Sequence, residues 1–291
     1  MSENEIGGII TGITSIYSLD QKIQGMLSFD DDSFIQEHKQ LTDIVHSNDS
    51  RIFMQIAIVD ILSMYLDDSI NNFTKYEIGD IVSLFTNASI RAQNAGYDGV
   101  QLHAAHFFFL SKFISPLYNN RTDEYGGSNK YRSRILVEIL NDIKKHTNDD
   151  FIVLIKINAS DFMHGGLEIE DCVEICQLLD ENNIDAIEVS ANNTSRINIK
   201  AGVNEAYFRE YGEIISSYVD CPVILVGGHR SIDCMNELLN TTDIEYLSLS
   251  RPLICDPELI KRWHSGDVKN SRCISCNRCY NTPYHQCYLN L

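Results

Sequence analysis

The segment that decides the fold runs from Gly96 to Arg134 and reads GYDGVQLHAAHFFFLSKFISPLYNNRTDEYGGSNKYRSR. The apolar residues before His103 are typical of a buried strand, and this strand leads directly into His103-Ala-Ala-His106. In β/α barrels the loops that follow the strands form the active face, so two imidazoles at a strand's carboxyl end indicate a catalytic site. A lone buried histidine is more often a satisfied core residue, but a pair on one turn favours the functional interpretation.

The remainder of this segment resembles a known protein family. The elements HAAH, SPLxNxRTDEYGGS and RxR occur in the order and spacing of the Old Yellow Enzyme-type NADH:flavin oxidoreductases, in the branch that includes dienoyl-CoA reductases and trimethylamine dehydrogenase. The resemblance implies an α/β fold, a TIM (β/α)8-type barrel that binds FMN. It also implies hydride transfer from NAD(P)H through the flavin to an activated alkene or a related small-molecule acceptor, with His103 and His106 holding the acceptor's carbonyl oxygen.

The RTDEYGGS loop itself has the features of a structural element. Gly126-Gly127 is expected to turn the chain, and Ser128 is expected to cap the following helix. Three arginines are expected to tie the loop down, namely Arg121, Arg132 and Arg134.

Along the whole chain, short strand patterns alternate with helical patterns, which predicts parallel strands joined by crossover helices. Seven strands are expected at Ile6–Thr14, Arg51–Ile58, Gly99–His103, Phe151–Asn158, Ala186–Ser190, Pro222–Gly227 and Ile244–Ser250. Helices are expected near Ser33–His46, Tyr76–Ala95, Lys130–His146, Glu168–Glu181, Glu205–Tyr218, Ser231–Leu239 and Asp256–Ser265.

A closed barrel of this type needs eight strands, so one is expected to be absent. The run IGGIITGIT within Ile6–Thr14 resembles the family's second strand, which predicts a barrel truncated at its N-terminus and an open seam beside Ile244–Ser250 that a partner chain could cover. The loop after Arg51–Ile58 is also shorter than is usual in the family. A natural fragment, a misplaced start and a degenerate paralogue all remain possible explanations.

Composition restricts the class of protein. The chain has 291 residues, 44% of them hydrophobic, and a formal net charge of -18, from 23 Lys and Arg against 41 Asp and Glu. One large core is expected, with residues 1–266 forming the barrel. The acidic balance argues against nucleic acid or an anionic membrane as a partner. No apolar run is long enough to span a bilayer, and the acidic N-terminus is unlike a signal peptide, which predicts a cytoplasmic protein.

The resemblance implies a set of residues that hold FMN. Gly227-Gly228 and Ser250-Arg251 follow two late strands and resemble the family's phosphate site, where glycines let backbone amides approach the oxygens. Gln55 matches an amide contact to the pyrimidine ring. Gly12 matches a small residue that leaves room for the flavin.

Lys156 lies within the apolar strand pattern LIKIN. Lysine is almost never fully buried without a partner, so a packing role explains it poorly. By resemblance Lys156 lies beside flavin N1, where a cation stabilises the anionic reduced flavin. No GxGxxG motif follows a strand, so a separate Rossmann domain is not indicated.

The last segment, residues 267–291, is rich in cysteine. Its four thiols are Cys273, Cys276, Cys279 and Cys287. The segment resembles the one that holds a [4Fe–4S] cluster in the dienoyl-CoA reductase branch, which favours a cluster and a redox partner for it; a structural zinc or unligated thiols are the alternatives. The other cysteines, including Cys255, are expected to be packing residues.

The leading hypothesis is therefore an FMN-dependent oxidoreductase of the Old Yellow Enzyme type. A flavin or iron–sulfur electron-transfer protein, or an impaired paralogue, is the first alternative. A barrel metallohydrolase is weaker, because HAAH lacks the further ligands such a site requires. Old Yellow Enzymes commonly supply a proton from a tyrosine just after the second His or Asn of the pair; Phe108 stands at that position, and phenylalanine has no proton to give.

Overall fold

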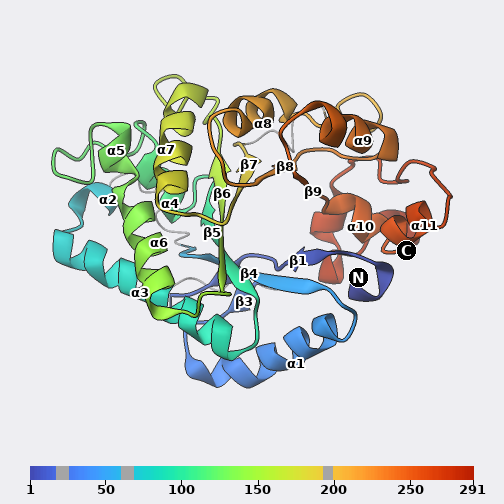
Figure 1. Cartoon of the computed structure of the whole chain (residues 1–291), viewed down its shortest axis with the longest axis horizontal. Coiled ribbons are helices and arrows are strands. Elements are labelled where there is room, and N and C mark those ends of the chain that lie inside the picture. Colours follow the sequence, from blue (N-terminus) through green and yellow to red (C-terminus); the bar gives the residue numbers. More distant parts are fainter. Residues whose placement is uncertain (18–25, 60–68, 193–198) are drawn as a thin grey trace.

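The computed structural model describes residues 1–17, 26–59, 69–192 and 199–291, and shows a curved parallel sheet surrounded by helices (Figure 1). The strands follow the order β3-β2-β4-β5-β6-β7-β8-β9, and β1 pairs with β4 beside this path. Their bounds are β1 Gly8–Ile10, β2 Thr14–Ser15, β3 Leu27–Ser28, β4 Arg51–Ala57, β5 Gly99–Ala104, β6 Ile152–Asn158, β7 Ala186–Ser190, β8 Val223–Val226 and β9 Tyr246–Ser248.

Helices connect these strands and lie on the outside of the sheet. Their bounds are α1 Ile35–His46, α2 Ser69–Asn72, α3 Lys75–Asn94, α4 Phe109–Ile114, α5 Asn129–Arg132, α6 Arg134–His146, α7 Ile169–Glu181, α8 Arg209–Ser216, α9 Ile232–Thr241, α10 Arg251–Cys255 and α11 Leu259–His264. Short 3₁₀ turns are η1 Ser2–Asn4, η2 Asp32–Phe34, η4 Arg278–Asn281, η5 Pro283–His285 and η6 Tyr288–Asn290. The longest helix, α3, starts at a capping box in which Thr74 and Glu77 each bond the other's backbone amide.

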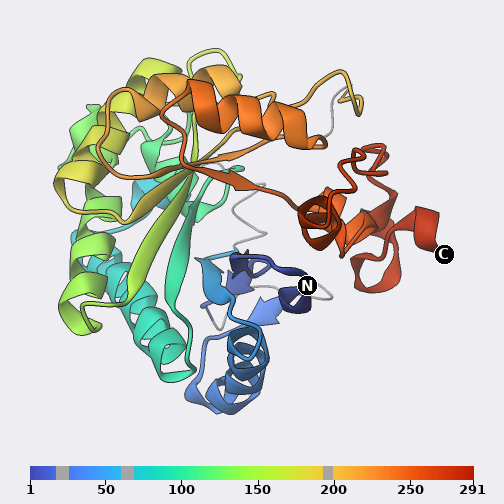
Figure 2. The same cartoon turned by 45° about the vertical axis from the view of Figure 1, so that its right-hand side comes forward.

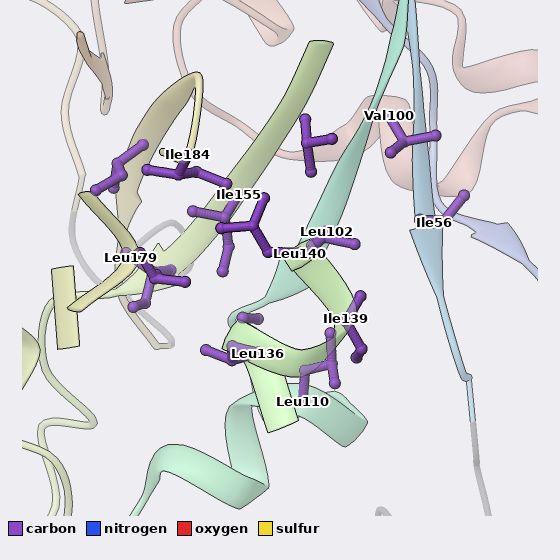
Figure 3. Packing of buried hydrophobic residues seen from close by; sticks show 14 of the residues in the cluster. Ile56, Val100, Leu102, Leu110, Leu136, Ile139, Leu140, Ile155, Leu179 and Ile184 are labelled. Atoms are coloured by element: carbon purple, nitrogen blue, oxygen red, sulfur yellow. The ribbon is translucent and has the colours of Figure 1, made fainter. Parts of the chain in front are cut away.

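The hydrophobic core lies between the outer face of the sheet and these helices. Figure 3 shows side chains of α4, α6 and α7 gathered against β5 and β6. Successive residues of a strand point to opposite faces, so Val100, Leu102 and Ala104 of β5 pack against helices while Gln101 and His103 face the barrel interior. The apolar residues of β5 thus fix its register and direct its polar residues inward.

The predicted barrel architecture is confirmed, with corrections to individual elements. The predicted strand Ile6–Thr14 is two short strands: β1 pairs with the start of β4, and β2 pairs with its end. β2 also pairs with β3, which the sequence did not predict. The predicted helix Lys130–His146 is divided at Ser133 into α5 and α6. Most of the loop expected to be short after β4 lies outside the described residues.

The N-terminal segment approaches the C-terminal helices through side chains. Among the described strands, β9 pairs with β8 alone. Figure 2 shows the N-terminus beside the α10–α11 segment. There Ile6 packs against a cluster that contains Leu253 and Trp263, and the Glu5 carboxylate lies 2.6 Å from His264 Nδ1. Apolar and ionic contacts, rather than strand pairing, therefore bridge this side of the barrel in the described part of the chain.

The RTDEYGGS loop is held by hydrogen bonds from buried groups. The Arg121 guanidinium donates to the carbonyl of Ile70 at 2.7 Å and forms two bonds with Asp123. A Cβ added to Gly126 would lie 2.2 Å from the Arg121 carbonyl oxygen, so this close approach requires glycine.

The other residues expected to support this loop have mixed roles. Arg132 donates to the carbonyls of Ile114 and Gly127 and so ties the loop down as expected. Arg134 instead pairs with Glu138 in α6 at 2.7 Å and lies over the ring of Tyr125, which belongs to the loop. Ser128 occupies the cap position of α5, but its side chain makes no capping bond, so that detail of the prediction is wrong.

Candidate active site

A row of polar side chains crosses the barrel interior from β4 to β7. The side-chain amide of Gln55 donates to Gln101 Oε1 at 2.7 Å, and the amide of Gln101 donates to Glu188 Oε2 at 2.7 Å. The other oxygen of Glu188 lies 3.1 Å from Lys156 Nζ. Of the charged pair, Glu188 is 2% and Lys156 13% exposed. The row supplies the partner that buried Lys156 requires.

The two histidines lie at the carboxyl end of this row. His103 on β5 stands opposite Lys156 on β6 in the parallel register. His106 follows a turn in which it and Phe107 both adopt left-handed backbone conformations, with φ of 61° and 63°. Such conformations are costly for residues with a Cβ, and they are found in tight turns and at active sites. The turn brings the two imidazole rings to a centroid distance of 5.2 Å.

Hydrogen bonds from neighbouring strands fix His106. Its backbone amide donates to Asn158 Oδ1 at 3.1 Å, and its Nε2 lies 2.8 Å from the hydroxyl oxygen of Ser190. Asn158 is held in turn by the buried carboxylate of Asp161, which also accepts from Ser115 at 2.5 Å. The strand ends of β5, β6 and β7 thus form one rigid polar network around the imidazole.

Both imidazoles are neutral at pH 7. Burial, followed by the nearby His106 ring and Lys156, holds the pKa of His103 well below its ordinary value. Burial and the charge of Lys156 lower the pKa of His106 to about 4, although Glu188 acts in the opposite direction. A neutral imidazole carries one N–H, so the pair can donate hydrogen bonds to a carbonyl oxygen without carrying charge.

We expect these shifts to make the fold sensitive to acid. The pKa of His106 is lower in the folded chain than its ordinary 6.5, so the unfolded chain binds the proton more tightly. The contribution of His106 to the free energy of unfolding is therefore fully present above about pH 6.5, and it is lost as the pH falls towards 4. His106 contributes a loss of up to about 3 kcal/mol, reduced by its partial exposure.

Urea denaturation at pH 7, 5.5 and 4 measures this effect. The wild-type free energy of unfolding should fall more steeply with acid than that of His106→Asn, whose amide does not titrate in this range. Parallel curves for the two proteins would contradict the predicted role of His106.

The predicted phosphate site lies at the ends of β8 and β9. Gly227 and Gly228 have φ of 134° and 82°, in the region that favours glycine, and a Cβ on Gly228 would lie 2.6 Å from the Asn204 carbonyl oxygen. Within the described residues, the backbone amides of Gly228 and His229 have no hydrogen-bond acceptor. Such free amides at a strand end are suited to oxygen atoms of a phosphate.

Arg251 supplies positive charge beside these amides. It follows Ser250, which is exposed at the start of α10, and it hydrogen-bonds both Tyr207 and the side chain of Asn277. A second buried arginine, Arg230, donates to the Cys273 carbonyl at 3.1 Å. These arginines connect the candidate phosphate site to the cysteine-rich segment.

Gly12 lies between β1 and β2, where a Cβ would meet no atom within 4 Å. A larger side chain would also fit within the described chain at this position, so the role of Gly12 beside a flavin stays a prediction. The side-chain oxygen of Gln55, on the adjacent strand β4, has no hydrogen-bond donor among the described residues. The space at Gly12 could accommodate a planar ring, and the side-chain oxygen of Gln55 could accept a hydrogen bond from it.

The four cysteines of the last segment line one small cavity of about 20 Å³. Arg251 also lines it, and Cys255 lies in a buried cluster with Cys273 and Cys287. Across residues 1–17, 26–59, 69–192 and 199–291, no group of three or more His, Cys, Asp or Glu side chains is placed to hold a metal ion. Four thiols are donors of the type that bind iron–sulfur clusters, and the cavity between them is small.

The structure brings the predicted residues together in two groups. His103, His106, Lys156 and Gln55 form the first, and Gly227, Gly228, Ser250 and Arg251 form the second. Gln101 and Glu188, which were not predicted, connect Gln55 to Lys156 within the first group. The signal was present, because a glutamate within the apolar strand Ala186–Ser190 needs a buried partner just as Lys156 does.

The described part of the chain contains no helix with the length and apolar character to cross a bilayer. Comparison with solved structures shows likeness to a histamine dehydrogenase from Rhizobium sp. 4-9, with a TM-score of 0.83 at 22% identity over 96% of this chain and 44% of that one. An old yellow enzyme homologue from Zymomonas mobilis gives a TM-score of 0.74 at 17% identity, covering 92% of this chain and 82% of the other. These likenesses confirm the barrel fold.

Sequence comparison identifies the family. An NADH oxidase from Thermoanaerobacter brockii is 30% identical over 92% of this chain and 45% of its own length. The chain spans about half the length of the curated relatives it matches. Residues 60–270 match the family model described as NADH:flavin oxidoreductase / NADH oxidase. The predicted family is thereby confirmed: the chain belongs to the NADH:flavin oxidoreductase / NADH oxidase family.

Proposed function

We propose that this chain binds FMN inside the barrel and transfers hydride from NAD(P)H, through the flavin, to an activated alkene or a related electrophilic acceptor. One observation carries the proposal: a neutral His103–His106 pair lies beside Lys156 at the strand ends. Neutral N–H donors polarise a conjugated carbonyl, which makes the carbon at the far end of the alkene electrophilic.

The residues present fit FMN at three points. Lys156 and Gln55 supply a cation and an amide for the pyrimidine edge, and the amides of Gly228 and His229 with Arg251 supply donors for the phosphate. When bound, FMN supplies the two-electron chemistry that no side chain of the chain can perform. The protein's part is to orient the acceptor through His103 and His106 and to hold the flavin's charged edges.

Reconstitution with FMN tests the proposal. The flavin should remain bound through gel filtration, NADH or NADPH should bleach its absorbance under anaerobic conditions, and an activated enone should restore the absorbance. Loss of the flavin would overturn the proposal. Retention of a flavin that NAD(P)H reduces but no enone reoxidises would favour the electron-transfer alternative.

We expect Arg251→Ala to weaken FMN binding. The charge-assisted contact is worth roughly 1.5–3 kcal/mol, which corresponds to roughly 10- to 150-fold in Kd. Fluorescence titration with FMN measures the change. Arg209→Ala is the matched control, because Arg209 on α8 pairs with Glu213 and Glu237 on the surface. Equal Kd values for the two variants would place the phosphate elsewhere.

A second proposal concerns residues 267–291, which we treat as a separate cysteine-rich segment. We infer that Cys273, Cys276, Cys279 and Cys287 hold a [4Fe–4S] cluster that exchanges electrons with a redox partner. All four thiols line one cavity, which supports a site that they share. The segment must open to admit the cluster.

Anaerobic purification tests the cluster. Iron and acid-labile sulfide should both be present in wild type and fall in Cys276→Ser, whereas Cys234→Ser, outside the segment, should retain them. Zinc without sulfide would support the structural-metal alternative.

We also propose a cellular location and binding partners for the protein. The net charge of -18 supports a location in the cytoplasm and disfavours nucleic acid and anionic membranes as partners. One edge of β9 has no strand partner within the described residues, and a second copy of the chain could bind there. Light scattering after gel filtration distinguishes monomer from dimer.

A further inference from the structure

Glu188 is a buried carboxylate on strand β7. Its side chain is 2% exposed, one oxygen lies 3.1 Å from Lys156 Nζ, and the other accepts from Gln101 at 2.7 Å. The hydroxyl of Ser248 on β9 also bonds it. A buried ion pair costs desolvation energy that the attraction does not always offset, so it is weak evidence for stability alone.

The carboxylate remains ionised in this setting. Burial acts to raise the pKa of Glu188, but Lys156, Gln101 and Ser248 together hold it below its ordinary value. His106 also lies close enough to interact with Glu188, and burial lowers the pKa of this imidazole so that it is neutral at pH 7. The polar row from Gln55 to Lys156 therefore carries one positive and one negative charge, and the two nearly cancel within this row.

This pairing matters for a flavin. A lysine without a counter-ion would favour the anionic reduced form by its full charge, whereas a lysine paired at 3.1 Å acts mainly as a dipole. The hydrogen bond also restricts the position of Nζ. The same contact thus sets both where the cation lies and how strongly it acts.

We propose that Glu188 is a positioning residue that holds Lys156 as an ion pair and thereby lowers the reduction potential of FMN bound in the barrel. The inference rests on the proposed FMN site. It also predicts proton coupling: with a neutral pair, the reduced flavin keeps a second proton to higher pH than it would beside an unpaired lysine.

The experiment measures the two-electron potential of bound FMN by equilibration with redox dyes from pH 6 to pH 9. Glu188→Gln keeps the shape of the side chain and removes the charge. The reduction potential of FMN bound to this variant should be higher than that of wild type at every pH. Below a certain pH, reduction of the flavin by two electrons takes up two protons, and above it one proton. This pH should be lower in the variant than in wild type. An unchanged or lower potential would overturn the inference.

Two controls separate charge from packing. Glu188→Asp keeps the charge and should have a potential close to that of wild type, while Ser248→Ala removes a neutral bond and should not raise the potential. If Glu188→Asp behaves like Glu188→Gln, shape rather than charge is responsible and the inference fails. If only Glu188→Gln loses FMN, the carboxylate serves binding and the inference also fails. A wild type that retains no FMN would instead refute the proposed function.

Discussion

Replacing His106 with leucine should slow oxidation of the reduced protein by an activated enone by about 10²–10³-fold, the usual cost of one donor to a developing oxyanion. His106 is fixed by Asn158 and Ser190, so its imidazole cannot be replaced by a neighbouring side chain without rearrangement of two strand ends. The same change should leave reduction by NAD(P)H nearly unaffected, because that step develops no charge on an acceptor oxygen.

Stopped-flow kinetics measures the two half-reactions separately. His106→Asn is the matched variant, since its amide keeps an N–H donor and should recover part of the lost rate. His103→Leu should behave like His106→Leu if both rings hold the same oxygen, as their centroid distance of 5.2 Å allows. Equal slowing of both half-reactions would indicate a general disturbance of the flavin site. Full activity in His106→Leu would remove the histidine from the mechanism.

Much of this site could be predicted from sequence because local patterns determine it. The alternation in GVQLHA fixes which residues of β5 face inward, and the buried Val100 and Leu102 enforce that choice. The RTDEYGGS loop is equally local, since Arg121 and Gly126 contact each other within one turn region. For such segments, residue type and spacing carry nearly all the required information.

The contacts that join distant strands could not be predicted in the same way. Lys156 is recognisable as a buried cation, but its partner Glu188 is set by the register of β6 against β7, which sequence spacing does not encode. The N-terminal strands show the same limit. Gly8–Ile10 and Thr14–Ser15 are too short to show a clear period, and their pairing depends on β4.

The largest gain of activity is expected from Phe108→Tyr. Reduction of an alkene needs a hydride at one carbon and a proton at its neighbour, and the ring of Phe108 lies at a centroid distance of 4.6 Å from that of His103. A hydroxyl added to this ring would lie beside His103, near the carbon adjacent to the carbonyl group that we propose the two imidazoles hold. A positioned general acid contributes roughly 10²–10⁴-fold to a rate, so Phe108→Tyr should reduce an enone faster than wild type by up to that factor.

The matched control is Phe107→Tyr, which adds the same hydroxyl to the neighbouring ring. Phe107 packs against Tyr118 at 5.6 Å, so its new hydroxyl should not serve the acceptor and the rate should stay close to wild type. Tyr118→Phe tests whether that tyrosine already supplies the proton, in which case the rate falls and Phe108→Tyr adds little. With flavin loading equalised, an unchanged rate in both Phe108→Tyr and Tyr118→Phe would show that proton supply does not limit the reaction. The aromatic run Phe107–Phe109 would then act as the apolar wall of a pocket for an acceptor that needs no proton from the protein.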